Sequence, residues 1–344
     1  MKKAVVAFAI GVAVCLPIAG CKKSEDSKTA IKTGSADTVP KTDDRVELKL
    51  KWPVGNRYVQ RMDIVQCSEI NVPQAPQPVK QEVTMGQDYS LTVTQKRPGG
   101  GHVLELEFLS TEMDVTMGGK SVMTFDSKGE AGDETRNPLA AMFRKMAGAR
   151  IMYLMDVSNQ VERVEGFEEF REKVTKDSPP QARDMLTGIY SEDYLKQMVG
   201  YSRNLPANAV KPGETWPVQT EIAMGPMGSV VSEATYTFKG WELHGKQRCA
   251  LLEFTGTLKS KEGLAPGKPG MNMTIENGVS SGKTWFDPEL GMFRESAIDQ
   301  DLNMRITFQA SPDPANPALQ GQTMTSTMSQ QIKIILSEVS QGSK

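Results

Sequence analysis

The chain has 344 residues, with 40 Lys and Arg against 42 Asp and Glu and a formal net charge of −2 at pH 7. Charges of both signs are mixed along its length, so no basic face indicates a nucleic-acid partner. The 2 histidines of the chain are distant from each other in sequence, which weighs against a histidine-built metal site.

The N-terminal segment, residues 1–20, has the pattern of a secretion signal. Lys2 and Lys3 precede an uncharged, mostly apolar run that ends in small residues. A membrane span needs about 20 apolar residues, whereas this run is shorter and is interrupted by Gly and Pro near its end. We therefore expect residues 1–20 to be removed from the mature protein.

The junction Ile18-Ala19-Gly20-Cys21 resembles the lipobox of bacterial lipoproteins. This resemblance implies cleavage before Cys21, a thioether-linked diacylglyceryl group on its sulfur and usually a further N-acyl chain. Two or more acyl chains give stable membrane anchoring. Residue 22 is Lys rather than Asp, which under the sorting rule of such lipoproteins favours the outer membrane.

The stretch over residues 21–44 is rich in Lys, Ser, Thr and Asp and has almost nothing to bury. Such a stretch cannot offset its own ordering entropy. We expect a polar tether there, then one folded domain over residues 45–338, then a short tail at residues 339–344.

The chain contains 4 cysteines. With Cys15 removed in the signal and Cys21 lipidated, Cys67 and Cys249 are left in the folded part. In an oxidising compartment these two could pair, and two separate buried thiols are an equal alternative.

Alternating apolar and polar residues dominate the folded part. Tyr89, Leu91 and Val93 are separated by Ser90 and Thr92, which is typical of a strand with one buried face. The same alternation recurs at residues 104–108, 234–238, 302–308 and 332–336. Turn residues at 98–101, 118–119 and 287–291 favour antiparallel hairpins between such strands.

A helical insert is expected over residues 136–204, between two strand-rich parts. Asn137 and Pro138 open a segment in which the apolar residues follow a helical stripe. Further helices are expected around Phe170, from Ser178 and from Ser191. A short strand pair is expected near residues 151–164.

The two strand-rich parts, residues 45–135 and 205–338, resemble each other. Three short matches occur in the same order in both: 55–58 with 213–216, 105–108 with 251–254, and 124–126 with 285–287. The predicted fold is α+β and mainly antiparallel β, built from a duplicated β unit with the helical insert covering one side. Its sheet is either strongly curved or split into two packed half-sheets.

Two serine-enzyme patterns overlap in the stretch from Gly278 to Lys283, G-x-S-x-G and S-x-x-K. A nucleophile elbow requires a helix after the serine, but a strand pattern follows Gly282. On a strand, Ser280 and Lys283 point to opposite faces. We therefore interpret Gly278, Ser280 and Gly282 as small packing residues on one strand face and expect no enzyme activity.

Other site types have weak support in the sequence. Asp299 and Asp301 lie two apart on one strand face and could hold a calcium ion with help, although solvated carboxylates are the preferred interpretation. No glycine loop that cradles phosphate precedes a helix. We expect neither a metal nor a cofactor.

The chain has 20 methionines against 4 tryptophans. Flexible thioether side chains fill irregular cores, and they also line deformable apolar surfaces. Both interpretations stay open. If a cavity exists, the candidate lining residues are Met142, Phe143, Met146, Met185 and Met198.

The chain resembles an uncharacterised family of bacterial lipoproteins that share a lipobox, a polar tether and short G-x-x-[YW] and [FW]-D motifs. Tyr58, Trp216, Phe125-Asp126 and Phe286-Asp287 carry this resemblance. A more distant likeness, of architecture only, is to LolA/LolB-type lipoprotein carriers.

Two functions follow as hypotheses. The first is a membrane-anchored envelope lipoprotein, non-enzymatic, that binds a lipid or other hydrophobic ligand between sheet and helices. The alternative is a structural or assembly protein of the envelope that acts through contacts with a protein partner.

Overall fold

The computed structural model describes residues 45–73, 75–130, 138–176, 178, 183, 191–223, 229–261, 271–308 and 322–341. The predicted signal, tether and lipidation site at Cys21 lie outside these residues. So do Met185 and most of the segment where a helix was expected to begin at Ser178.

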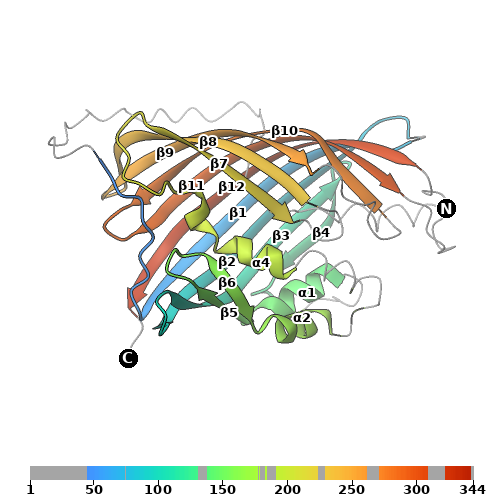
Figure 1. Cartoon of the computed structure of the whole chain (residues 1–344). Coiled ribbons are helices and arrows are strands. Elements are labelled where there is room, and N and C mark those ends of the chain that lie inside the picture. Colours follow the sequence, from blue (N-terminus) through green and yellow to red (C-terminus); the bar gives the residue numbers. More distant parts are fainter. Residues whose placement is uncertain are drawn as a thin grey trace.

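In the described part of the chain, twelve strands form one antiparallel sheet (Figure 1). The strands are β1 (Asn56–Asn71), β2 (Val79–Lys96), β3 (His102–Met117), β4 (Lys120–Asp126), β5 (Arg150–Met155), β6 (Val161–Glu165), β7 (Thr215–Ala223), β8 (Ser229–His244), β9 (Gln247–Ser260), β10 (Met271–Asp287), β11 (Met292–Phe308) and β12 (Thr323–Gln341). Their order is β6-β5-β3-β2-β1-β12-β11-β10-β9-β8-β7, with β4 also paired to β3. Strand β12 continues to Gln341, past residue 338 where the sequence placed the end of the domain.

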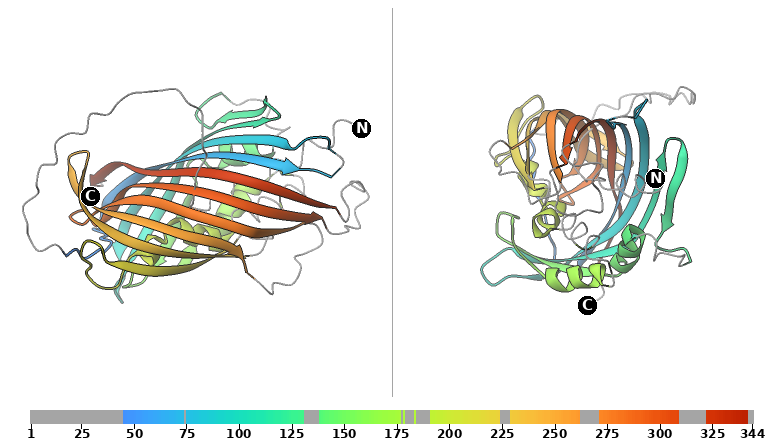
Figure 2. Two further views of the ribbon diagram at one scale, coloured as in Figure 1. Left: turned by 90° about the horizontal axis from the view of Figure 1, so that it is seen from above. Right: turned by 90° about the vertical axis from the view of Figure 1, so that its right-hand side faces the viewer.

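The sheet is continuous and strongly curved, which confirms the predicted fold class and decides between its two forms. Strand β1 pairs with β12 from Asn56↔Gln341 to Asn71↔Thr325, so the two halves share one backbone ladder. The accumulated twist of so many strands curls the sheet into a trough (Figure 2). Period-2 alternation then places one set of side chains on the inner face of the trough.

Three α-helices of the described chain come from the predicted insert. Helix α1 (Pro138–Met146) contacts β3 and α2 (Phe167–Thr175) contacts β5. Aromatic contacts fix both, since the rings of Phe143 and Phe125 lie 6.1 Å apart and those of Phe170 and Phe108 lie 5.5 Å apart. The expected strand pair between α1 and α2 is β5 with β6.

Helix α4 (Glu192–Met198) and the 3-10 turn η2 (Tyr201–Asn204), which we call the α4–η2 strap, cover the open side of the trough. Helix α4 contacts both edge strands, β6 and β7 (Figure 1). The Tyr153 hydroxyl donates to the Leu195 carbonyl at 3.0 Å, and Trp216 Nε1 donates to the Asn204 carbonyl at 3.0 Å. The strap therefore bridges two sheet edges that do not pair with each other.

One end of the trough, which we call the closed end, is crossed by the segment of residues 45–54. Val46 exchanges backbone hydrogen bonds of 2.8 and 2.9 Å with Val210, and the Lys51 amide donates to the Gly291 carbonyl at 3.0 Å. Trp52 is buried edge-on against Tyr58, with ring centroids 5.7 Å apart. This segment shields the inner side chains at that end from water.

The first of the three sequence matches between the halves coincides in the structure, whereas the second is displaced by two residues, because Val93 faces Leu104 and Phe238 faces Leu252. Gly55 and Gly213 have φ of 89° and 88°, and their amides donate to Val93 at 2.8 Å and to Phe238 at 2.7 Å. Val93 and Phe238 each stand at a register shift, in β2–β3 and in β8–β9. The turns at Gly55 and Gly213 thus lead into equivalent strand pairs, β1 with β2 and β7 with β8.

The third match does not superpose. Phe125 pairs with Met113, which follows the matched residue Phe108 along β3. Phe286 pairs with Ala250, which precedes the matched residue Phe254 along β9. The reason is that β4 is a 7-residue strand that covers one end of β3, while β10 has 17 residues and covers most of β9. The similarity of the two [FW]-D motifs is therefore local.

Asp287 gives a test of the closed end. Its carboxylate accepts the amides of Glu289 and Leu290 at 2.9 and 3.0 Å and pairs with Arg294 at 2.7 Å, and its side chain is 3% exposed. Asp287→Ala leaves the guanidinium without its partner, so we expect the free energy of unfolding to fall by about 3 kcal/mol.

The control is Asp126→Ala. Asp126 is exposed and accepts the Lys128 amide at 2.8 Å in a comparable turn, so its loss should cost at most about 1 kcal/mol. Urea unfolding of both variants measures the difference, and equal losses would contradict the role assigned to Asp287.

Candidate functional site

A cavity of about 210 Å³ lies between the inner face of the trough and the α4–η2 strap. It is lined by Met62 of β1, Tyr89 of β2, Val218, Thr220 and Ile222 of β7, Ser232, Ala234 and Tyr236 of β8, Leu252 and Phe254 of β9, Thr284 of β10, Phe293, Ser296 and Ile298 of β11, Ile332 and Ile334 of β12, and Gln197, Met198, Gly200, Arg203, Asn204 and Leu205 of the strap region. Most of these side chains are apolar.

Aromatic rings form one wall of the cavity. Tyr236 stacks on Trp216 and Phe254, with centroids 5.8 and 4.9 Å apart. Burial raises the pKa of the Tyr236 phenol well above its ordinary value, so this ring is neutral at physiological pH. The wall therefore presents aromatic surface without charge.

The few polar groups of the sheet wall are uncharged and partly satisfied. Thr284 and Ser296 hydroxyls lie 3.2 Å apart, and the Tyr89 hydroxyl donates to Gln60 at 2.7 Å. Arg203 is the charged residue among the described lining residues, and its side chain is exposed on η2 at the rim. Apolar surface inside and a cation at the rim suit an apolar or amphipathic ligand.

Towards the closed end the cavity stops at filled core. Tyr58, Phe238 and Phe286 are fully buried there. Phe286 meets the cavity residue Phe293 edge-on, with centroids 5.2 Å apart. Large aromatic side chains thus occupy the inner face between the cavity and the segment of residues 45–54.

Of the residues that the sequence suggested as cavity lining, Met198 lines this cavity. Met142, Phe143 and Met146 are buried on α1, in the core beside β3 and β4, and are not among the residues that line it. Met185 lies outside the described residues. Met62 and Ile298 were missed, although the alternation of their strands marks them as inner-face residues.

Ser280 lies inside β10, which continues as a strand on both sides, so the chain makes no nucleophile elbow there. Ser280 is buried, whereas Lys283 is on the other face and pairs with Glu253 at 3.0 Å. The small residues around it make room for side chains of the neighbouring strands β9 and β11. A Cβ on Gly282 would stand 2.5 Å from the Phe254 ring, and one on Gly278 would stand 2.7 Å from Leu302.

No group of His, Cys, Asp and Glu within the described ranges could hold a metal ion. Asp299 and Asp301 are exposed on β11 and face Gln331 and Ser329 of β12. His244 lies 3.3 Å from Glu295 and stacks on Trp285, and burial lowers the pKa of His102 with help from Lys96.

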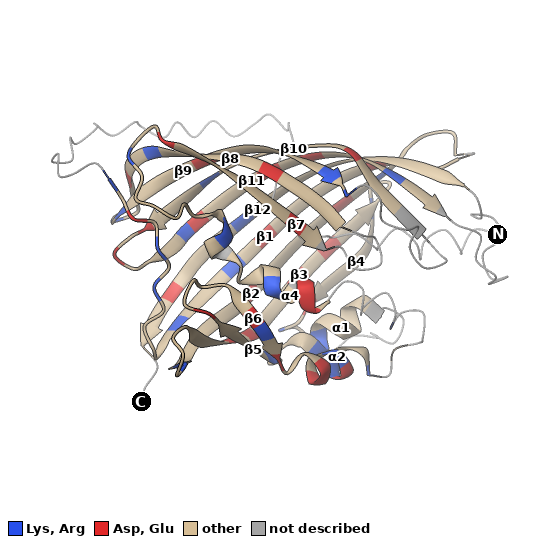
Figure 3. Ribbon diagram, viewed as in Figure 1, with Lys and Arg blue, Asp and Glu red and all other residues tan. Residues whose placement is uncertain are grey.

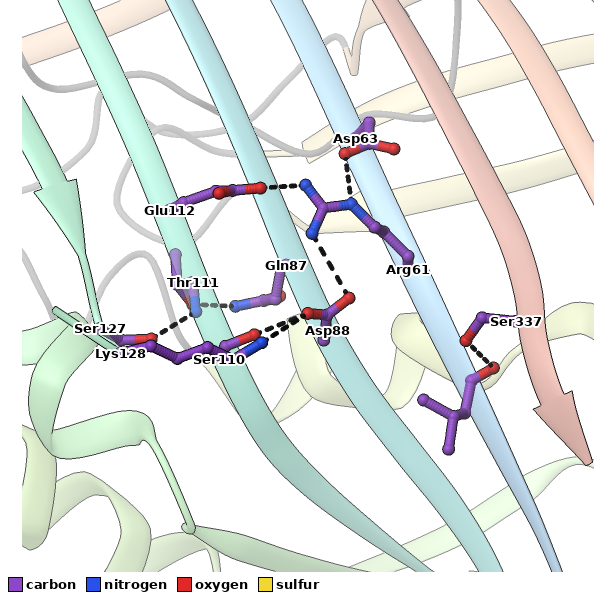
Figure 4. A network of polar contacts seen from close by, with 11 residues as sticks. Arg61, Asp63, Gln87, Asp88, Ser110, Thr111, Glu112, Ser127, Lys128 and Ser337 are labelled. Atoms are coloured by element: carbon purple, nitrogen blue, oxygen red, sulfur yellow. Dashed lines mark hydrogen bonds and ion pairs between the residues drawn. The ribbon is translucent and has the colours of Figure 1, made fainter. Parts of the chain in front are cut away.

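A polar cluster outside the cavity spans the outer face of β1, β2 and β3 (Figure 4). Arg61 contacts Asp63 at 2.8 Å, Asp88 at 3.5 Å and Glu112. The hydrogen bond with Glu112 is the main cause of the raised pKa of Arg61. Because a Cβ on Gly86 would stand 2.2 Å from the guanidinium, glycine at this position lets Arg61 reach across β2. The cluster braces three strands and leaves Arg61 paired.

Charged residues of both signs are interspersed along the strands, as Figure 3 shows. In the described part of the chain, none of the helices has the length and apolar character needed to cross a membrane. Of the features described above, the cavity with its mostly apolar lining most favours a ligand.

Cys67 lies on β1 and is partly exposed, and Cys249 lies on β9 and is buried. Both side chains are thiols in the structure. Burial, with a smaller contribution from the nearby Asp287 carboxylate, raises the pKa of the Cys249 thiol to about 11.

A family model described as a family of unknown function (DUF6263) matches residues 100–293. No curated protein matches the sequence. Among solved structures the chain is similar to lipovitellin, in a structure titled for lipid-protein interactions, with a TM-score of 0.46 and 10% identity. That match covers 86% of this chain, which spans about a quarter (26%) of the lipovitellin chain.

Two further solved structures give weaker matches. An outer membrane channel from Pseudomonas putida F1 has a TM-score of 0.18 and 8% identity over 86% of this chain and 100% of the channel. OpdQ of Pseudomonas aeruginosa has a TM-score of 0.20 and 5% identity over 83% of this chain and 98% of its own. At such TM-scores none of these likenesses carries an argument about function.

The raised pKa of Cys249 predicts slow alkylation. A thiol reacts as its thiolate, and a pKa near 11 keeps Cys249 protonated at pH 8, where an ordinary cysteine of pKa about 8.5 is partly ionised. We expect Cys249 in a Cys67→Ser variant to react with iodoacetamide at least about a hundredfold more slowly than Cys67 in a Cys249→Ser variant. The rate should keep rising with pH up to about 11, and a rate that levels off near pH 9 would contradict the assignment.

Proposed function

The chain belongs to the DUF6263 family, whose function is unknown, and we propose that it is a lipid-anchored protein of the bacterial cell envelope that binds a hydrophobic ligand beneath the α4–η2 strap. The expected membership of an uncharacterised family is thereby confirmed. The observation that carries the proposed binding function is the apolar cavity of about 210 Å³ inside the trough.

The size of the cavity limits what it accepts in this conformation. Protein interiors are usually filled to crystal-like density, so an apolar space of this size is uncommon. An apolar cavity of about 150 Å³ is enough to bind benzene, whereas drug-sized ligands occupy about 300–1,000 Å³. The cavity therefore suits one ring or a short acyl segment, and a longer chain requires part of its lining to move.

The α4–η2 strap is the part of the lining suited to move. Helix α4 has 7 residues, and a helix so short is not stable without tertiary contacts. The bond between Gln160 and the Ser202 hydroxyl, at 2.8 Å, adds to the two bonds of Tyr153 and Trp216. The sheet wall is held by continuous ladders, so the strap should open at lower free energy than the wall. Met198 on the strap adds a flexible side chain.

The proposed anchor rests on the sequence around Cys21. Acyl chains at this residue would hold the trough close to a bilayer through a polar tether, and Lys22 favours the outer membrane. A cavity protein held in this way has access to lipids of its own membrane. The proposed role is binding rather than catalysis.

Filling the cavity should weaken binding. Ala234 lines the cavity on β8, so we expect Ala234→Phe to weaken binding of a fluorescent fatty acid at least about tenfold by occupying its space. The control is Ala297→Phe, on the outer face of β11 between Lys283 and Lys333 in register. Circular dichroism and thermal unfolding verify that both variants fold.

Native mass spectrometry of the purified protein tests the proposal independently, because we expect co-purified lipid. Bare polypeptide in that experiment, together with no uptake of fatty acid by the unaltered chain, would refute hydrophobic-ligand binding. It would favour instead an envelope protein that acts through a protein partner.

The anchor has a separate test. Cys21→Ser removes the sulfur that would carry the diacylglyceryl group, so radiolabelled palmitate should no longer enter the protein and the protein should leave the membrane fraction. Cys67→Ser serves as the matched control and should keep both the label and the membrane association. Palmitate incorporation that survives Cys21→Ser would contradict lipidation at this residue.

A further inference from the structure

A row of buried polar side chains crosses the inner face of the trough. Ser280 of β10 faces Gln300 of β11, Gln300 faces Gln330 of β12, and Gln330 faces Gln66 of β1. We call these residues the glutamine row. Their exposed fractions are 5%, 0%, 0% and 4% in that order, so all four side chains are buried in the interior of the trough.

Several polar atoms of the glutamine row have no hydrogen-bond partner. Both Oε1 and Nε2 of Gln300 lack one, as does Oγ of Ser280. Gln66 donates through Nε2 to the Ser68 hydroxyl at 3.2 Å, but its Oε1 accepts no bond. Buried polar groups are nearly always paired, and an unpaired one is costly. Donors and acceptors thus gather at one place with their bonding capacity unused.

The row borders the apolar cavity. Ile298 and Ile332 face each other in register and both line the cavity. Gln300 and Gln330 are the next inner-face residues on the same strands, about 7 Å further from the closed end at two residues' rise. The two sites are therefore adjacent layers of one interior, apolar first and polar second.

The surroundings of the row are uncharged. The inner-face neighbours on either side are Ile298 and Ile332 towards the cavity, and Leu302 and Met328 away from it. Carboxylates of β11 alternate to the exposed outer face, as at Asp299 and Asp301. A charged group placed here would have no counter-ion, so the row suits a neutral group that both donates and accepts.

We propose that the glutamine row binds the neutral polar group of an amphipathic ligand, such as an acyl amide, ester or alcohol, whose apolar chain occupies the cavity. This inference rests on the proposed binding function and adds the class of ligand. Gln300 is its central residue because both of its amide atoms are unpaired.

The test uses the full chain and three chain-matched probes: octanamide, octanoate and octane. Each is titrated into protein mixed with N-phenylnaphthylamine, and the loss of dye fluorescence reports displacement of the dye. We expect the unaltered chain to bind octanamide about tenfold more tightly than octane or octanoate, since each net hydrogen bond contributes about 1 kcal/mol and tenfold is 1.4 kcal/mol. Gln300→Leu should remove this preference and leave octane binding unchanged.

The matched control is Gln331→Ala, which alters the neighbouring outward-facing glutamine and should keep the preference. Ser280→Ala, a smaller change in the same row, should reduce it about threefold and serves if Gln300→Leu does not fold. Equal binding of octane and octanamide by the unaltered chain, or a preference that survives both row variants, overturns the headgroup inference alone. Failure of all three probes to displace the dye overturns the binding function as well.

Discussion

The backbone ladder between β1 and β12 is the interaction on which the rest of the structure depends. These strands come from the beginning and the end of the described chain, and they pair over the whole length of β1. Without this ladder, each half would be a shorter sheet with its own edges. With it, the right-handed twist accumulates across every strand and the sheet curls until β6 and β7 approach each other. The inner face of the trough, and hence the cavity, exists only because the two halves form one sheet.

Curling leaves two edges that do not pair, and unpaired edges expose backbone donors and acceptors. The α4–η2 strap covers this opening through side-chain bonds rather than a ladder, with Tyr153 on β5 and Trp216 on β7 as its attachment points. The same arrangement produces a rigid wall and a weaker cover. A protein that admits a ligand needs this difference, because the wall keeps its shape while the cover moves.

The interior changes in character along the trough. At the closed end, the interior is filled by Tyr58, Phe238 and Phe286. Next to them, small and aliphatic side chains line the unfilled space of the cavity. The glutamine row lies beyond the cavity. Gly282 has no side chain, and the Phe254 ring occupies the space where one would be. This lets the large Phe254 side chain pack directly against β10. A volume bounded by aromatic rings on one side and neutral amides on the other matches an uncharged amphipathic molecule better than an ion or a nucleotide.

The sequence by itself determined the class of fold and its local elements, because those depend on short periods. Alternation at Tyr89, Leu91 and Val93 predicts a strand, the stripe at Leu139 and Met142 predicts helix α1, and the turn glycine before Tyr58 recurs before Trp216. Only the tertiary structure decided which strands pair, since Gln66 and Gln330 meet through a register between distant segments. The packing of separate helices against the sheet placed Met142 in the core and Met198 at the cavity, although both lie on helices of one insert. The spacing of apolar residues along a chain reveals whether a segment is a strand or a helix. A cavity, in contrast, is formed by residues that become neighbours only when separate elements pack together.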